Sequence, residues 1–353
     1  MNCLNKAKNI TSKYRLNKCT SKKCLLSEHL DAIKDKIESA NNLKEFFEVF
    51  IFVKSLNLKF KNEKLGSFYM NVAGLIFIIA LCLLGFFMNR LSFEAIRCFF
   101  WIVFGCVIFI IINVGFVFKE ISYTKKISDA IAFKKAALDN NFILKKSNKK
   151  KLLKFFKDLF LMFEQGNYSR KLIQYIKGGY KDKFVYHYFH FHYVDEDDDS
   201  SSDENGNIKS ETKYYHYDFY GIIIPFAGES FIKISNCQTI SKFNKWRTSS
   251  ISFNRKFKVY TDNEQAVAVF LQPKVIEQIE ELYETFPELD IEISSQGFLA
   301  LSTPDEELLN YTRQYGVDQL DLFEEEIKKV LDQIKLHKTL EFINFLKEYH
   351  AQT

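Results

Sequence analysis

The chain has 353 residues, of which 47% are hydrophobic, 16% aromatic and 26% charged. These values are ordinary for a globular protein and leave room for about two domains. The net charge of +5 is modest and the 7 Cys follow no metal-binding spacing, so neither a disulfide scaffold nor a cysteine-based metal site is predicted.

The first segment, 1–66, is basic and has a helical pattern. Seven basic residues precede the first acidic residue, Glu28: Lys6, Lys8, Lys13, Arg15, Lys18, Lys22 and Lys23. Anionic lipid headgroups or nucleic acid would attract such a cluster, and lipid is preferred because a bilayer is predicted nearby. Apolar residues recur at helical spacing across 25–64. The resulting helix could pack on a later domain, pair with another copy or lie on the bilayer.

Two uncharged apolar runs, at 68–88 and 99–118, predict a transmembrane hairpin that occupies 67–118. Each run supplies the ~20 residues that a helix needs to cross the hydrocarbon core. A signal peptide is not predicted, because the first run begins late and a second run follows it at once.

The distribution of lysine and arginine predicts the orientation of this hairpin. The flanks are rich in lysine, at positions 54, 59, 61 and 64 before the first run and 119, 125, 126, 134 and 135 after the second. The loop between the runs, Asn89 to Cys98, has only Arg90 and Arg97. Because positive charge stays on the cytoplasmic side, we expect a multi-pass protein of the inner (cytoplasmic) membrane with both termini in the cytoplasm.

Juxtamembrane helices are predicted over 119–180, with a helical pattern that runs from 121 to 177. Lysines cluster between Lys145 and Lys157, opposite a wide apolar face that includes Phe156 and Phe163. Such a helix could lie in the membrane interface. The preferred interpretation is a core helix of the cytoplasmic domain with a solvated basic face.

The last segment, 181–353, predicts a cytoplasmic domain of α+β class, with a mainly antiparallel sheet and flanking helices. Strands are predicted at 184–194 and 213–224, joined by an acidic loop at 195–207 that is too charged to bury. Further strands are predicted at 231–234, 257–261, 291–294 and 298–302, and helices at 273–286 and 318–350.

Several of these features resemble a bacterial two-transmembrane family known as domain-of-unknown-function family 3137. The residues that carry the resemblance are Phe257, Val259, Tyr260, Asp262, Ala266, Leu271 and Pro273, with Gly221 and Phe226 upstream and Gly297, Leu299 and Leu301 downstream. The resemblance covers roughly 60–345 and implies the paired spans followed by the domain. It implies no activity and no catalytic residues.

Four of the 7 His cluster, at His187, His190, His192 and His216. His190 and His192 share one face of a strand, and His216 on a paired strand could approach them. Imidazoles so placed could bind Zn²⁺, which makes His190, His192 and His216 metal candidates, although exposed sheet residues are the plainer interpretation. The acidic run fails the calcium-loop pattern, since Ser200 stands where glycine is needed.

The motifs G-x-S-x-G, H-E-x-x-H, G-x-x-x-x-G-K-[ST] and G-x-G-x-x-G do not occur, and Asp262, Asn263 and Glu264 are best explained as a turn and helix cap. The sequence therefore predicts a membrane-anchored binding or scaffold module without enzymatic activity or cofactor. Its expected partners are the bilayer, anionic lipid headgroups or a membrane-associated protein, with a homo-oligomer as a further option and no nucleic acid. The alternative is a membrane-bound enzyme with a metal site at the histidines.

Overall fold

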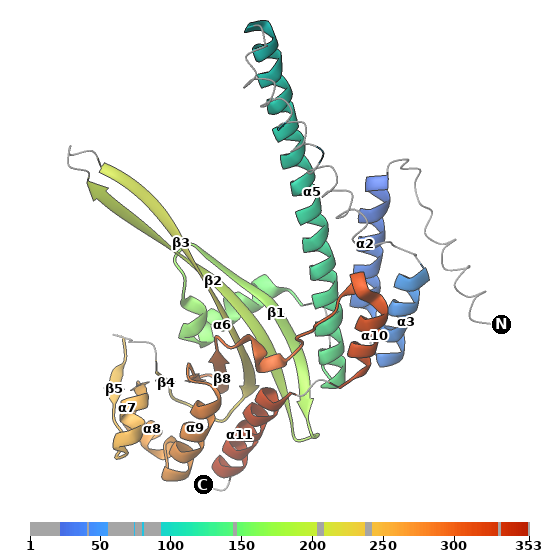
Figure 1. Cartoon of the computed structure of the whole chain (residues 1–353). Coiled ribbons are helices and arrows are strands. Elements are labelled where there is room, and N and C mark those ends of the chain that lie inside the picture. Colours follow the sequence, from blue (N-terminus) through green and yellow to red (C-terminus); the bar gives the residue numbers. More distant parts are fainter. Residues whose placement is uncertain are drawn as a thin grey trace, which may run out of the picture. The chain divides into compact units, whose positions relative to one another are not determined.

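The computed structural model describes residues 22–40, 42–55, 74, 80, 93–143, 147–202, 208–236, 242–330 and 333–351. The chain divides into two compact units (Figure 1). The first comprises 1–135 with 312–329, and the second comprises 136–311 with 330–353.

The first unit is helical. Its elements are α2 (Lys22–Ser39), α3 (Leu43–Ser55), α5 (Phe93–Asp139) as far as Lys135, η3 (Val317–Gln319) and α10 (Leu320–Lys328). Helix α3 starts with Asn42 as its N-cap, since Glu45 N donates to Asn42 Oδ1 (2.9 Å), and Asn42 Nδ2 donates in turn to Glu45 Oε1 (2.8 Å). It then buries a stripe of apolar side chains at helical spacing, namely Phe46, Val49, Phe50 and Val53.

Helix α10 joins these N-terminal helices although it lies far away in the sequence. Phe50 of α3 contacts Phe323 of α10 with ring centroids 5.7 Å apart. Arg313, just before α10, donates from Nε to Asp129 Oδ1 of α5 (2.9 Å), and Val317 N donates to Ser128 Oγ (3.0 Å). The segment predicted at 25–64 thus packs, in its described part, on a later part of the chain.

Helix α5 is 47 residues long and continuous, so residues 99–118 are helical throughout. Within the helical unit, Ile127, Ile131 and Ala132 of α5 are buried. Judged on the described residues, none of the helices is both long enough and apolar enough to cross a membrane. The predicted first span, 68–88, lies outside the described residues apart from Gly74 and Ala80, which are both helical.

The second unit is built on one eight-stranded antiparallel sheet in the order β1-β2-β3-β8-β7-β4-β6-β5. The strands are β1 (Ser169–Tyr180), β2 (Phe184–Ser202), β3 (Ile208–Pro225), β4 (Ile232–Ser235), β5 (Asn244–Trp246), β6 (Lys258–Thr261), β7 (Asp290–Ser294) and β8 (Phe298–Thr303). Helices flank this sheet, so the predicted α+β class with an antiparallel sheet is confirmed.

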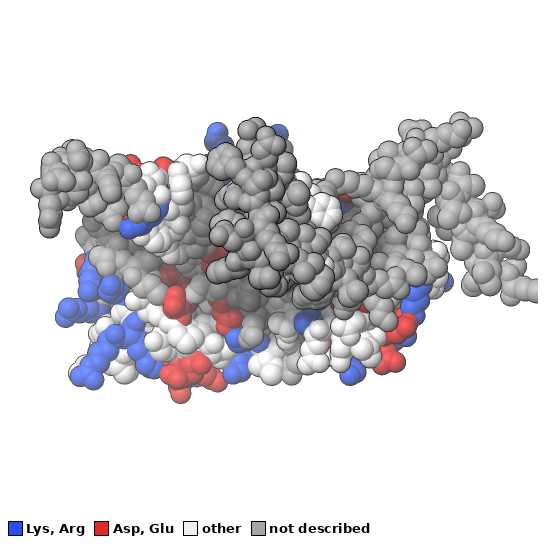
Figure 2. Space-filling view, turned by 45° about the horizontal axis from the view of Figure 1, so that its top comes forward, with Lys and Arg blue, Asp and Glu red and all other residues white. Residues whose placement is uncertain are grey.

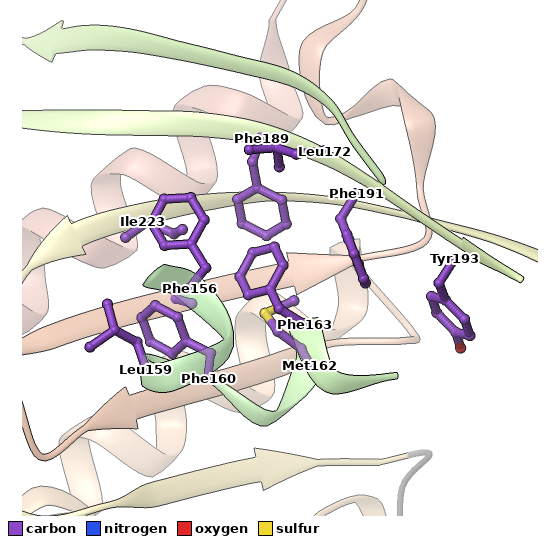
Figure 3. Close-up of a cluster of buried hydrophobic side chains, with 11 residues drawn as sticks. Phe156, Leu159, Phe160, Met162, Phe163, Leu172, Phe189, Phe191, Tyr193 and Ile223 are labelled. Atoms are coloured by element: carbon purple, nitrogen blue, oxygen red, sulfur yellow. The ribbon is translucent and has the colours of Figure 1, made fainter. Parts of the chain in front are cut away.

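One face of the sheet is covered by α6 (Lys149–Leu159) and the short helix η1 (Leu161–Glu164), as Figure 3 shows. Phe163 fits between Phe189 and Phe191 of β2, with ring centroids 5.1 and 5.0 Å away. Phe156 and Leu159 of α6 are buried in the same cluster. The apolar face of α6 is therefore part of the domain core, which is the second of the two roles predicted for it.

The opposite face carries α8 (Glu264–Phe270), α9 (Pro273–Thr285) and α11 (Ile334–His350), with η2 (Glu306–Leu309). Successive residues of a strand point to opposite faces. Glu292 of β7 bonds to η1, whereas the next residue, Ile293, lines a pocket with α8 and the end of α11. The short helix α7 (Ile251–Lys256) precedes β6, and Phe257 between them contacts Tyr283 of α9.

Three predictions about this region are wrong. Residues 169–177 form strand β1 and not a helix. Residues 195–202 of the predicted acidic loop are part of β2, paired with 208–215 of β3, while 203–207 lie outside the described residues. The domain boundaries also differ, because 136–180 belong to the sheet unit and 312–329 to the helical unit. Carboxylates are tolerated in β2 here because Asp197 and Asp198 are exposed, and Asp195 and Glu196 are only partly buried.

Candidate functional site

Polar side chains gather where strands β2 and β3 extend beyond their neighbours. The β2–β3 pairing places His190 opposite Tyr220, His192 opposite Asp218 and Val194 opposite His216. Because directly paired residues and residues two apart share a face, His190, His192, His216 and Asp218 all lie on one side of the sheet. We call these four residues the histidine cluster.

Asp218 is the centre of this cluster. Its Oδ1 lies 2.6 Å from His190 Nε2 and 3.0 Å from His192 Nδ1. An ionised carboxylate can only accept hydrogen bonds, so each of these two ring nitrogens carries the hydrogen and donates it. Partial burial alone would raise the pKa of Asp218, but the hydrogen bonds from the two histidines outweigh this and lower it. Asp218 is therefore a stable anion that fixes both rings.

His216 extends the cluster by one ring. Its Nδ1 lies 3.4 Å from His192 Nε2, and the two imidazoles are stacked with centroids 5.5 Å apart. His190 instead stacks on Tyr220, at 4.4 Å. The side chains of His190 and His192 are 15% and 20% exposed, so solvent reaches the cluster from one side.

His187 does not belong to this group. It pairs with Ile223, whose side chain lies in the core under α6, and its ring stacks on Tyr175 at 4.9 Å on that opposite face. Burial, with a smaller effect of Lys177, lowers the pKa of His187. Three of the four predicted histidines are thus brought together, and the fourth is a half-buried packing residue.

The predicted three-histidine ligand set is not assembled as such. Over the described part of the chain, no three or more His, Cys, Asp or Glu side chains form a group that could hold a metal ion. His190 directs Nε2 at Asp218, so that nitrogen is not available to a metal. Asp218 was not predicted, because it joins the histidines only through the strand register. Its position two residues after His216 was the available sequence signal.

A buried ionic group lies on the face that η1 covers. Lys233 of β4 is fully buried and bonds to Glu292 (2.5 Å) and Asp290 (3.1 Å) of the neighbouring strand β7. Glu292 also accepts hydrogen bonds from the backbone N–H groups of Leu161 (2.7 Å) and Met162 (3.1 Å). Burial alone would lower the pKa of Lys233, but the two carboxylates outweigh it and raise it. The group attaches η1 to the sheet.

A shallow cavity of about 330 Å³ lies between the loop after β3, α8 and the end of α11. Phe226, Phe270 and Ile293 contribute apolar surface, and the buried Nε2 of His350 has no hydrogen-bond partner among the described residues. Asn263 at its rim caps α8 by accepting from Gln265 N and Ala266 N, and Asp262 Oδ1 accepts from Phe231 N. Asp262 and Asn263 therefore have the structural roles predicted for them.

Comparisons with known proteins add little. No family model matches the chain, and no curated protein matches it. The resemblance to domain-of-unknown-function family 3137 therefore stays a prediction. Among solved structures, the crystal structure of the mycobacterial trehalose monomycolate transport factor A, TtfA, aligns with 57% of this chain and 96% of its own, at 12% identity and a TM-score of 0.32. A similarity this low carries no inference about function.

Proposed function

We propose that this protein is a membrane-anchored binding module without enzymatic activity. In this proposal, two helices at 68–88 and 99–118 cross the inner membrane, both termini are cytoplasmic, and the sheet unit binds a protein partner beneath the membrane. The observation that carries the anchoring is the change of environment along helix α5.

Between Trp101 and Ile112, the described side chains of α5 are large, apolar and exposed. Trp101 is 68% and Ile111 63% exposed, and Phe104, Ile108, Phe109 and Ile112 are also exposed. Contiguous apolar surface of this kind is rare on soluble monomers and marks contact with a membrane or another protein. Residues 99–118 contain no charge and, at helical rise, extend over about 30 Å, the thickness of the hydrocarbon core. A lipid environment accounts for both properties.

Fractionation of cells that make the full chain tests the anchor. We expect the protein to stay in the membrane pellet after high-salt and alkaline washes, because integral helices are not released by either. A reporter that fluoresces only in the cytoplasm should be bright at either terminus. Release of the chain by the alkaline wash would refute the anchor.

Paired variants of α5 make this test specific. Ile108→Lys with Ile112→Lys places two charges in the second span, each costing about 2.5–3.5 kcal/mol near the bilayer centre. We expect failed insertion of that span and a dark C-terminal reporter. Ile121→Lys, exposed on the same helix but beyond 118, should leave the reporter bright. Equal behaviour of the two variants would contradict the assignment of 99–118.

The binding surface that we propose is the β2–β3 ribbon, defined as 195–202 with 208–217, where β2 and β3 pair only with each other among the described strands. Its described side chains include Asp195, Glu196, Asp197 and Asp198, while Lys213 is the one lysine or arginine among them. Tyr214, Tyr215 and Tyr217 are 41–47% exposed. Tyrosines are enriched at interfaces, and the carboxylates favour a basic surface. The partner is therefore a protein with a basic patch, since anionic lipid would be repelled.

The charge on the surface visible in Figure 2 is otherwise mixed, with Lys and Arg beside Asp and Glu. Reversing the charge of the ribbon alone therefore tests whether its carboxylates, and not the net charge of the protein, bind the partner. A photo-crosslinking residue at Tyr215 should capture a basic protein in cells, and the same residue at exposed Ile251 of α7 should not. Asp197→Lys with Asp198→Lys should abolish the adduct.

The control for that experiment is Glu277→Lys with Glu281→Lys on α9, which changes the net charge equally at two exposed positions. It should leave the adduct intact. Raised salt should weaken the capture, because exposed charges are screened beyond about a Debye length. An adduct with lipid alone, or one that survives the ribbon reversal, would contradict a basic protein partner.

A further inference from the structure

The distance between His192 and His216 does not suit a simple hydrogen bond. The two facing nitrogens, His192 Nε2 and His216 Nδ1, are 3.4 Å apart. Protein hydrogen bonds with a nitrogen donor are centred near 2.9–3.0 Å and rarely exceed about 3.2 Å. The contact is longer than a good hydrogen bond, and it brings one nitrogen of each ring close together.

The same distance fits two ligands of one metal ion. Zinc binds imidazole nitrogen at about 2.0–2.1 Å with tetrahedral angles, which separates two such nitrogens by about 3.3–3.4 Å. Because His192 donates its Nδ1 hydrogen to Asp218, its Nε2 carries no hydrogen and keeps a lone pair, 3.4 Å from His216 Nδ1. One ion could therefore replace the long contact without any change in the strand register.

Asp218 supplies the support that histidine ligands of metals require. Such a histidine almost always donates its second ring nitrogen to a carboxylate or carbonyl, which fixes the tautomer and raises the basicity of the ligand. The 3.0 Å contact from His192 Nδ1 to Asp218 Oδ1 is this arrangement. His190 holds the carboxylate from its other side at 2.6 Å, so the supporting anion is itself fixed.

We infer that His192 Nε2 and His216 Nδ1 form an open, two-histidine site for a borderline divalent metal ion of the Zn²⁺ class. Imidazole ligands select such ions over Mg²⁺ and Ca²⁺, which prefer oxygen. His216 is exposed and lies at the base of the ribbon, so water or a donor from a bound protein completes the coordination. Asp218 and His190 are positioning residues and not ligands. The site does not depend on the membrane anchor.

Zinc binding to the purified full chain in detergent tests the site, with Zn²⁺ alone as the probe and a competing chromogenic chelator as the readout. The parent should bind one Zn²⁺ ion more than His192→Ala and one more than His216→Ala. His337→Ala removes an exposed histidine of α11 and should leave this ion bound. All variants keep the 7 Cys, so thiol binding is equal among them.

Two further variants separate a ligand from a structural role. His216→Cys supplies another metal donor at an exposed position and should restore binding. Asp218→Asn should weaken the affinity about 10- to 100-fold without removing the site, as loss of an outer partner does. Melting curves of each metal-free variant verify folding. The inference is overturned if the parent does not bind Zn²⁺, or if His192→Ala and His216→Ala bind as the parent does.

Discussion

Gly221 of β3 lies where two neighbouring strands crowd its backbone. A Cβ atom there would meet the carbonyl oxygen of Leu301 on β8 and would lie 2.5 Å from Cζ of Phe189 on β2. The ring of Phe189 has little room to move away, because it is fully buried and contacts the ring of Phe163 at a centroid distance of 5.1 Å. Glycine is required at this position for the close approach and not for its backbone angles.

We expect Gly221→Ala to destabilise the sheet unit by about 1–3 kcal/mol, the usual cost of overpacking a dense core. Thermal unfolding of the purified full chain measures this. Gly179→Ala in β1 is the matched control, since a Cβ atom at Gly179 would meet nothing within 4 Å. Equal melting temperatures for the two variants would show that the Gly221 contact is not restrictive.

Elements with a strong local signal were predictable from the sequence. Helix α9 starts at Pro273 as expected, because proline suits the first turn, and it ends one residue before the predicted 286. Strands β7 and β8 match the strands predicted at 291–294 and 298–302, and between them Gly297 has a φ of 82° that favours glycine. In these elements, local propensity and tertiary structure agree.

Strand β1 was mistaken for a helix because a bulge disguises its alternation. The register with β2 shifts between Leu172 and Gln174, so one extra residue enters the strand. Leu172 and Ile176 are both buried at a spacing of four, which imitates the helical period although they lie on opposite faces of the sheet. The bulge is defined by the pairing of β1 with β2, so the sequence of β1 by itself does not predict it.

Strands β2 and β3 are longer than the predicted strands 184–194 and 213–224, for a related reason. Charge density indicated a loop after Val194, because a sheet strand normally buries one face. Cross-strand contacts instead satisfy the carboxylates, as when Tyr214 OH donates to Glu196 Oε1 (3.0 Å) and Thr212 Oγ1 donates to Asp198 Oδ1 (2.9 Å). Only the pairing with β3 reveals these partners.

At the scale of the whole molecule, the sequence indicates which elements exist better than which elements pack together. Residues 318–350 were predicted as one helix or a helix pair, but α10 belongs to the helical unit and α11 to the sheet unit. The contacts responsible, such as Arg313 with Asp129, join residues that are far apart in the chain. The histidine cluster has the same origin, since Asp218 meets His192 only through the register of two strands.

Two histidines of the sheet unit make the stability of the protein depend on pH. Burial lowers the pKa of His187, with a smaller effect of Lys177, and burial lowers the pKa of His350. His187 faces Tyr175, and His350 faces Phe270 and Phe226. Both have an ordinary pKa of 6.5 in the unfolded chain. As the pH falls below that value, the unfolded chain takes up protons that the folded chain does not, and the free energy of unfolding falls.

We therefore expect the melting temperature of the full chain to fall as the pH is lowered from about 7 towards 5, and to be least sensitive above the unfolded-state pKa. His187→Phe keeps an aromatic ring against Tyr175 but cannot be protonated, so its melting temperature should depend less on pH. The same exchange at exposed His337 of α11 is the control and should retain the dependence of the parent. Parallel melting curves for His187→Phe and the parent across this range would mean that burial of His187 does not couple protonation to folding.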